Sequence, residues 1–154
     1  MKPTTPIKRA PELKAFSHDH HHGLLLCWKI KTGMAKNVEL KRIKEYVDWF
    51  YQNHLQEHFE LEEKYIFSIL ETGNEHIQQA LKEHKRLNHL FEASSDLETN
   101  LKCIEKELEA HIRFEERILF AEIQKSATKE QLETIEEVHS KEAFLENEDA
   151  NFWT

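Results

Sequence analysis

After Pro11 the sequence contains no further proline and only three glycines, so long stretches are free of residues that interrupt a helix. Glu, Lys, Leu, Ala and Gln dominate these stretches, and all five are strong helix formers. This pattern is typical of an all-α protein. A chain of 154 residues is also long enough to bury a hydrophobic core within one domain.

Apolar residues recur at helical spacing in four long segments, and the capping-box spacing of Thr128 and Gln131 predicts a fifth helix. Ser17 is a candidate N-cap of the first helix and Asn74 of the third, while Gly33 is a stop signal for the first. The predicted helices cover about residues 18–31, 38–71, 75–92, 97–125 and 129–147.

Long helices joined by short turns pack best as an up-down-up-down four-helix bundle. We therefore expect an all-α fold of this kind with an additional C-terminal helix. The sequence is interpreted as an extended N-terminal segment (1–15), the bundle (16–125), and a C-terminal helix and tail that pack on it (126–154).

The formal charge of −8 argues against nucleic acid as a main partner. No apolar run approaches the roughly 18 residues needed to span a membrane, and the N-terminus lacks a signal-peptide pattern. The cysteines, Cys27 and Cys103, form no disulfide framework. We expect a cytoplasmic protein that is a monomer or homo-oligomer, without a membrane or nucleic-acid partner.

One segment occurs twice in the chain. "HFELEEKYIF" covers residues 58–67 and "HIRFEERILF" covers residues 111–120. Each copy has His and the first Glu four residues apart, which places them on one face of a helix with Cβ atoms about 5 to 6 Å apart. The apolar residues of both helices place these faces inward. The two pairs are His58 with Glu62 and His111 with Glu115.

The chain contains eleven histidines, and the other two predicted bundle helices also carry inward ones. His84 lies on the apolar side of the third helix. On the first helix, His21 precedes Leu24 by three residues and fits the apolar stripe best. His20 and His22 remain alternatives for this position.

Burying two carboxylates costs free energy unless cations balance them. Two bridging carboxylates and two imidazoles for each cation would solve this problem and leave coordination positions open. This ligand set is typical of non-haem iron chemistry. No thiolate is expected nearby, which disfavours an iron–sulfur cluster or a structural zinc site.

Other acidic residues and histidines are expected outside this cluster. Glu63 and Glu116, the second acids of the two doublets, are expected to be exposed salt-bridge partners. His54 is either a supporting residue near the cluster or a partly exposed histidine. The remaining surface histidines are predicted to be His76, His89 and His139.

At these positions the chain resembles the hemerythrin-like family of HHE cation-binding domains. Over about residues 16–124, the segments "SHDHHHGLLL", "HFELEE", "EHKRL" and "HIRFEERILF" are similar to the four ligand segments of that family, in order. The resemblance implies a four-helix bundle with a non-haem di-iron centre. It implies that Glu62 and Glu115 bridge the irons, with zinc or manganese as substitute metals. The implied ligands are His21, His58, Glu62, His84, His111 and Glu115.

The resemblance implies binding of dioxygen or nitric oxide, with a role in oxygen or nitric oxide response or in iron handling. Oxygen carriers of the family have a second His four residues after the third-helix ligand, where this chain has Asn88. His89 is one residue later and turned off the face. This departure implies either a weaker ligand or an extra open position at one iron and does not favour reversible oxygen carriage. A di-iron oxidase or peroxidase, and a metal-free interaction module with pH-sensitive histidines, are the alternatives.

Overall fold

A computed structural model describes residues 8–139, 146–147 and 151–154. The described chain is helical and contains no β-strand, which confirms the prediction of an all-α fold. Its α-helices are α1 (Lys14–Ala35), α2 (Leu40–Phe50), α3 (Gln56–Leu61), α4 (Glu75–Glu92), α5 (Leu97–Phe114), α6 (Phe120–Ser126) and α7 (Lys129–Val138). A short 3-10 helix, η1 (Pro11–Leu13), precedes α1.

Two of the predicted helices are interrupted by π-helical turns. The segment from α2 to Ile69 includes the turns η2 (Tyr51–Leu55) and η3 (Glu62–Ile66), and it ends in a 3-10 turn, η4 (Phe67–Ile69). The turn η5 (Glu115–Leu119) joins α5 to α6. η3 and η5 begin at equivalent glutamates of the repeated segment. Such turns are rare and are frequent at functional sites.

Two predicted helix caps are confirmed. The Asn74 side chain accepts hydrogen bonds from the backbone N–H groups of His76 and Ile77 at the start of α4. Thr128 and Gln131 form the expected capping box of α7. The last predicted helix ends at Val138, and Asn147 is not helical, while residues 140–145 lie outside the described part of the chain.

The predicted boundaries of the first helix are wrong. α1 begins at Lys14, so Ser17 lies within the helix and its hydroxyl donates to a carboxylate oxygen of Glu116 at 2.9 Å. Gly33 also lies within α1, which ends at Ala35. Gly33 therefore does not end the helix. Its lack of a side chain instead allows close packing against the C-terminal residues.

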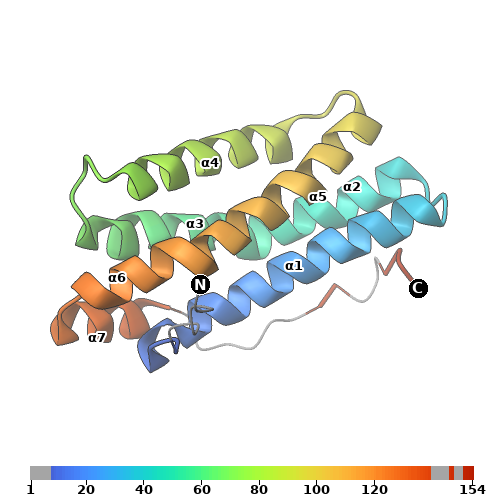
Figure 1. Cartoon of the computed structure of the whole chain (residues 1–154). Helices are drawn as coiled ribbons and strands as arrows, with labels where there is room; N and C mark the ends of the chain where they lie inside the picture. Colours follow the sequence, from blue (N-terminus) through green and yellow to red (C-terminus); the bar gives the residue numbers. More distant parts are fainter. Residues whose placement is uncertain (1–7, 140–145, 148–150) are drawn as a thin grey trace, which may run out of the picture.

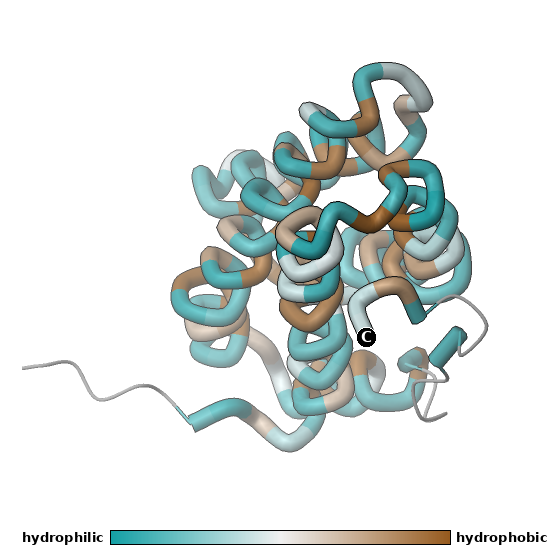
Figure 2. Tube along the Cα trace, turned by 90° about the vertical axis from the view of Figure 1, so that its right-hand side faces the viewer, coloured by the Kyte–Doolittle hydropathy of each residue, from teal (hydrophilic) through white to brown (hydrophobic). Residues whose placement is uncertain are grey.

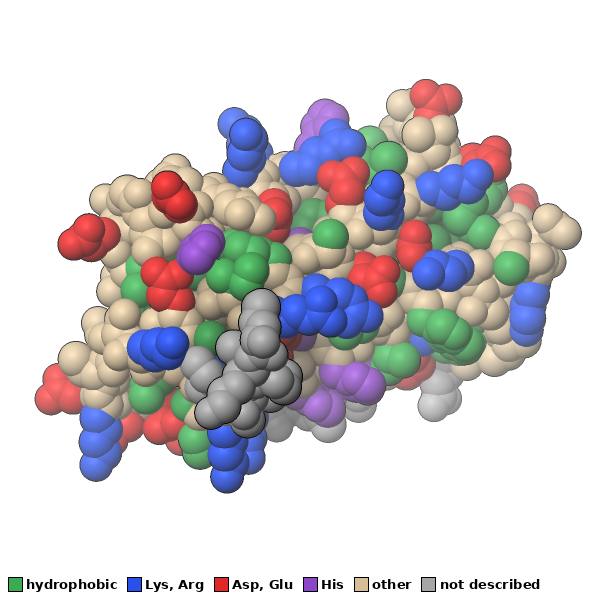
Figure 3. All heavy atoms as spheres, viewed as in Figure 1, with side chains coloured by type: hydrophobic (Ala, Val, Ile, Leu, Met, Phe, Trp, Pro, Cys, Tyr) green, Lys and Arg blue, Asp and Glu red, His purple; other side chains and the backbone are tan. Residues whose placement is uncertain are grey.

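The long helical segments α1, α2–α3, α4 and α5–α6 lie lengthwise beside one another, and α7 packs near the start of α1 (Figure 1). Hydrophobic and hydrophilic residues follow one another within the helical turns in Figure 2, as expected for helices with one buried face. Lys, Arg, Asp and Glu side chains are interspersed over the face shown in Figure 3. Among the described residues, no helix is both long and apolar enough to cross a membrane.

The apolar core is divided into two clusters. One includes Leu26, Phe59 and Phe152, and the other includes Phe16 and Phe120. Both clusters contribute aromatic rings to the same buried polar residues: Phe59 stacks on His84 with ring centroids 4.0 Å apart, and Phe120 stacks on His20 at 5.2 Å. A polar layer therefore lies between two apolar clusters.

The C-terminal residues pack beside the α1–α2 end of the molecule (Figure 1). The Phe152 side chain is 1% exposed and packs edge-on against the Tyr46 ring, with centroids 5.4 Å apart. A Cβ atom added to Gly33 would lie 2.6 Å from two carbons of the Phe152 ring. The absence of a side chain at Gly33 therefore allows the ring to reach its buried position.

We expect Gly33→Ala to lower the free energy of unfolding by about 1 to 3 kcal/mol, because overpacking against a rigid ring outweighs the gain in helix propensity. Chemical denaturation measures this change. In a Phe152→Ala background the same substitution should be neutral or stabilising, since the obstructing ring is absent. An equal loss in both backgrounds would show that the ring is not the cause.

Candidate metal centre

Six polar side chains are buried between the helices. His20 lies on α1, His58 on α3, His84 on α4 and His111 on α5, while the two glutamates begin the π-helical turns η3 and η5. None is more than 3% exposed. We refer to these residues as the central cluster: His20, His58, Glu62, His84, His111 and Glu115.

The central cluster divides into two groups that could each hold a metal ion. One group contains His20 and His58, the other contains His84 and His111, and Glu62 and Glu115 belong to both. In each group the candidate ligand atoms lie within 4.8 Å of one another. Ligands on opposite sides of one ion at about 2.0 to 2.2 Å would be separated by up to about 4.4 Å, so the spacing suits one ion for each group.

The inward-facing atoms are the imidazole Nε2 atoms. His58 Nε2 lies 3.2 Å from Glu62 Oε1, and His111 Nε2 lies 3.1 Å from Glu115 Oε1. His84 Nε2 lies 3.2 Å from Glu62 Oε1, and His20 Nε2 lies 3.0 Å from Glu115 Oε1. Each glutamate therefore contacts an imidazole of each group, as a bridging ligand would.

Several of these atoms make no hydrogen bond of good geometry, although some of them lie 3.1 to 3.2 Å from an opposite group. Within the described chain, these atoms are both carboxylate oxygens of Glu62, Oε2 of Glu115 and Nε2 of His84 and His111. Leaving buried polar groups without partners costs free energy, whereas metal coordination would satisfy them. The orphaned atoms are of the right chemical types, since carboxylate oxygens and imidazole nitrogens are both ligands of transition metals.

Each imidazole contacts a carboxylate through Nδ1, the ring nitrogen that faces away from the centre. His20 Nδ1 donates to Glu116 at 2.8 Å, His58 Nδ1 to Asp19 at 3.0 Å, His84 Nδ1 to Glu63 at 2.8 Å and His111 Nδ1 to Glu83 at 2.7 Å. We call Asp19, Glu63, Glu83 and Glu116 the outer carboxylates. Such contacts fix ring orientation and direct Nε2 at the centre, and metal-ligating histidines commonly have partners of this kind.

These contacts repeat with twofold regularity along the chain. In each half, an acid and the His that follows it come from the first helical segment, and His-x-x-x-Glu-Glu comes from the second. Asp19 orients His58 in the first half as Glu83 orients His111 in the second. Glu63 orients a histidine of the second half, and Glu116 orients one of the first. The repeat therefore supplies both sets of inner and outer groups.

Electrostatics favour charged forms of the central cluster in the metal-free protein. Burial disfavours imidazolium, but the nearby carboxylates outweigh burial and raise the pKa of His58 to about 9 and that of His111 to about 10. The pKa values of His20 and His84 are also raised by neighbouring carboxylates against the effect of burial.

The two inner glutamates are held ionised. Burial raises the pKa of Glu62, but the imidazoles around it lower that pKa well below its usual value. For Glu115, burial and the charge of Glu62 both raise the pKa, and His111 and His20 more than offset them. In the metal-free protein, protons on the imidazoles balance charge that metal ions would otherwise balance.

Five of the six predicted ligands lie in the central cluster, and the sixth does not. His21 is exposed, so its predicted inward position is wrong, and His20 takes that place on α1. The buried face of α1 runs through His20, Gly23, Cys27 and Ile30. Because Gly23 has no side chain, the buried face of α1 lacks an apolar residue at this position, and the apolar pattern in the sequence does not point to His20.

The sequence did not reveal the roles of the outer carboxylates. Glu63 is exposed and Glu116 is partly exposed, and both form ion pairs, as predicted. The prediction did not include the partner, which in each case is a buried imidazole. The sequence does contain a sign of these roles, because both internal copies carry a doublet of acids at the same position. Asp19 and Glu83 each precede an inward His directly, a second shared feature that identifies them.

The other histidines are distributed as follows. His89 is exposed, as predicted, while His76 is partly exposed and contacts Glu122 at 2.5 Å. His139 is not a simple surface residue: its Nε2 contacts Asp19 at 2.6 Å, and its ring packs on Phe16. His54 is partly buried against aromatic rings and is absent from both candidate metal groups.

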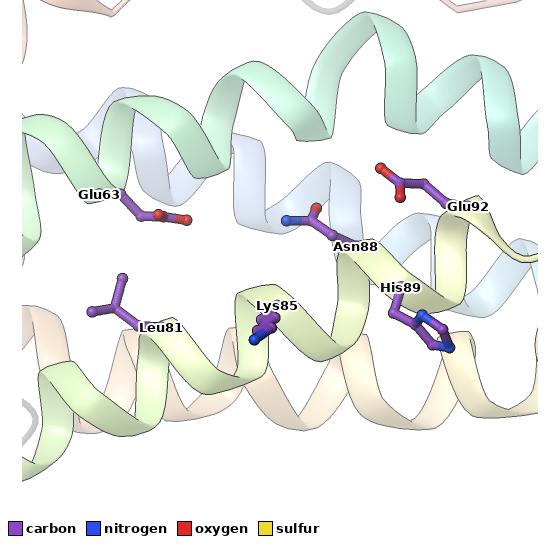
Figure 4. A pocket seen from close by; sticks show the side chains of 6 residues that line it. All are labelled: Glu63, Leu81, Lys85, Asn88, His89 and Glu92. Carbon is purple, nitrogen blue, oxygen red and sulfur yellow. The ribbon is translucent and has the colours of Figure 1, made fainter.

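Asn88 and His89 line an open surface hollow and are in neither candidate metal group. Asn88 accepts a hydrogen bond from the Tyr51 hydroxyl at 2.7 Å. Figure 4 shows Asn88 and His89 pointing in different directions, with Glu63 on the opposite side of the hollow. The two metal groups of the described chain therefore have equal numbers of imidazoles.

Comparison of the chain with models of protein families, with curated proteins and with solved structures gave no match. The site is therefore interpreted from its own geometry. Its buried His and Glu groups could hold two metal ions that share two carboxylates.

We expect Glu83→Ala to weaken metal binding by about 10- to 100-fold, because His111 would lose the partner that orients its ring. Competition with a chromophoric chelator measures the affinity. Glu60→Ala, which removes an exposed acid from α3, is the matched control and should bind normally. Glu83→Gln keeps an acceptor and should have a smaller effect, whereas normal affinity of Glu83→Ala would contradict the orienting role.

The shifted pKa values of the central cluster predict how the stability of the metal-free protein varies with pH. The folded pKa values of about 9 for His58 and about 10 for His111 exceed the unfolded value of about 6.5. Their contribution is therefore fully present below about pH 6.5 and is lost as pH rises through 9 to 10. The lowered pKa values of Glu62 and Glu115 give a contribution that is present above about pH 4.5 and is lost in acid.

Denaturation of chelator-treated protein should therefore show a loss on the order of 1 to 3 kcal/mol between about pH 7 and pH 10. His111→Gln should show a smaller loss over this range, because one of the titrating groups is absent. Stability that is constant or rises from pH 7 to pH 10 in the wild-type protein would contradict the assigned charges.

Proposed function

We propose that this chain is a hemerythrin-like protein with a carboxylate-bridged di-iron centre that binds dioxygen or nitric oxide. The observation that carries the proposal is the sharing of Glu62 and Glu115 between two pairs of buried imidazoles. A single-ion site would not need two symmetric imidazole pairs. The lengthwise packing of α1, α2–α3, α4 and α5–α6 supports the four-helix bundle of that family (Figure 1).

The ligand chemistry favours iron. Each group offers two imidazoles and carboxylate oxygens, a set that suits non-haem iron, with zinc or manganese as substitutes. Neither Cys27 nor Cys103 belongs to the candidate groups, so the described ligands include no thiolate. When bound, two ferrous ions would supply electrons and open coordination positions for a diatomic ligand.

The surrounding residues would fix the centre and keep it dry. The outer carboxylates hold each imidazole by its Nδ1–H group, so that Nε2 stays directed inward. Phe59 and Phe67 cover the His84 ring, and Phe16 and Phe120 lie against His58 and His20. These rings limit access of water to the imidazoles.

The ligand balance favours binding over strong oxidation chemistry. The central cluster has four imidazoles and two carboxylates, whereas ferritin-like di-iron enzymes have mostly carboxylates. Fewer negative ligands stabilise ferrous ions relative to ferric ions. A role in oxygen or nitric oxide response or in iron handling is therefore proposed ahead of an oxidase or peroxidase activity.

The test is anaerobic loading of tag-free protein with ferrous iron, followed by metal analysis and an optical spectrum before and after addition of air or nitric oxide. We expect about two irons per chain and new near-ultraviolet charge-transfer bands after addition. Glu115→Gln should retain fewer irons because it removes a bridging charge. Glu109→Gln, on α5 and six residues before Glu115, is the matched control.

Each other outcome selects a different function. Catalytic turnover of a reductant by the oxidised protein would indicate an oxidase or peroxidase. Iron binding without any spectral response to either gas would contradict diatomic binding. A stable protein that retains no metal would overturn the di-iron proposal and favour a metal-free module with titratable histidines.

A further inference from the structure

Helix α1 carries three histidines in addition to the buried His20, and two of them are close neighbours. The Nε2 atoms of His18 and His22 lie 3.2 Å apart, and their rings are perpendicular with centroids 4.8 Å apart. Successive residues of an α-helix are rotated by about 100°, so positions two residues before and after His20 lie on the opposite side of α1. His18 is exposed and His22 is partly exposed, as this geometry requires.

We propose that His18 and His22 chelate one divalent transition-metal ion on the outer face of α1, at a site separate from the central cluster. An i, i+4 pair places both side chains over the same turn of the helix. With two nitrogen ligands at about 2.0 to 2.1 Å, the 3.2 Å separation corresponds to an angle of about 100° at the ion. This angle lies between the tetrahedral and octahedral values.

The ligands determine which ions suit this site. Two imidazoles favour borderline ions in the order Cu²⁺ above Ni²⁺ and Zn²⁺, whereas Mg²⁺ and Ca²⁺ prefer oxygen ligands. The same two nitrogen atoms form an N–H···N contact in the metal-free protein. An ion would replace the shared proton, with water in its remaining positions.

His21 provides an internal control. Its ring centroid lies 6.2 Å from that of His18 and 5.5 Å from that of His22. His21 is part of the same histidine-rich surface and lies three residues after His18, but its ring stacks on that of His18 at 6.2 Å, farther than the 4.8 Å between the rings of His18 and His22. It contributes to the local density of imidazoles without being a member of the close pair.

Chromatography on immobilised Cu²⁺ or Ni²⁺ tests the site in the tag-free full-length protein. A resin-held ion can reach exposed histidines, but not the central cluster, whose histidines are at most 3% exposed. We expect the wild-type protein to be retained, and His18→Ala and His22→Ala to elute at clearly lower imidazole concentrations. His21→Ala, and His89→Ala on α4, should be retained nearly as well as wild type.

A titration with Zn²⁺ or Cu²⁺ against a chromophoric chelator gives the affinity in solution. His18→Ala and His22→Ala should each weaken one equivalent of binding by about tenfold or more, because the second ligand of a chelate binds at high effective concentration. The number of ions bound by the central cluster should not change. The difference from wild type is therefore diagnostic even if the di-iron proposal fails.

Two results would overturn this site. One is a wild-type protein that flows through the resin. The other is equal retention and equal titration of wild type, His18→Ala and His22→Ala. Circular dichroism of each variant controls for folding, which should be preserved because alanine is the best helix former and these positions face outward.

Discussion

Two fully buried carboxylates, Glu62 and Glu115, impose the requirement that the rest of the structure meets. Their negative charges must be balanced inside a helical core, because unpaired buried charges cost an amount of free energy comparable to the whole net stability of a small domain. The four imidazoles provide this balance as protonated rings or as metal ligands. The division of the apolar core into two clusters follows, because side chains between them must be polar.

The internal repeat gives the centre its symmetry. Each half of the chain contributes an acid and His on one helical segment and His-x-x-x-Glu-Glu on the next. The first Glu of each doublet faces both metal groups, while the second reaches a histidine of the other half. A π-helical turn begins at the first Glu in both halves, so the backbone irregularity is repeated together with the side chains.

Much of the fold could be predicted because its signals are local. The lack of interrupting residues and the caps at Asn74 and Thr128 depend only on nearby sequence, as do the His-x-x-x-Glu pairs. His20 was only an alternative to His21 because Gly23 interrupts the apolar stripe of α1, whereas half-buried Leu24 and Leu25 suggest another phase. The packing of Phe152 on Gly33 depends on residues more than a hundred positions apart, so no local sequence pattern predicts it.

The outer carboxylates connect the helices in a closed circuit. Asp19 of α1 holds a ring on α3, Glu63 holds one on α4, Glu83 holds one on α5, and Glu116 returns to α1. Every helical segment thus supplies an imidazole and also steadies the imidazole of its neighbour. A slide of one segment along its axis would disturb ligands on two segments at once, so binding strength at the centre is coupled to helix register throughout the molecule.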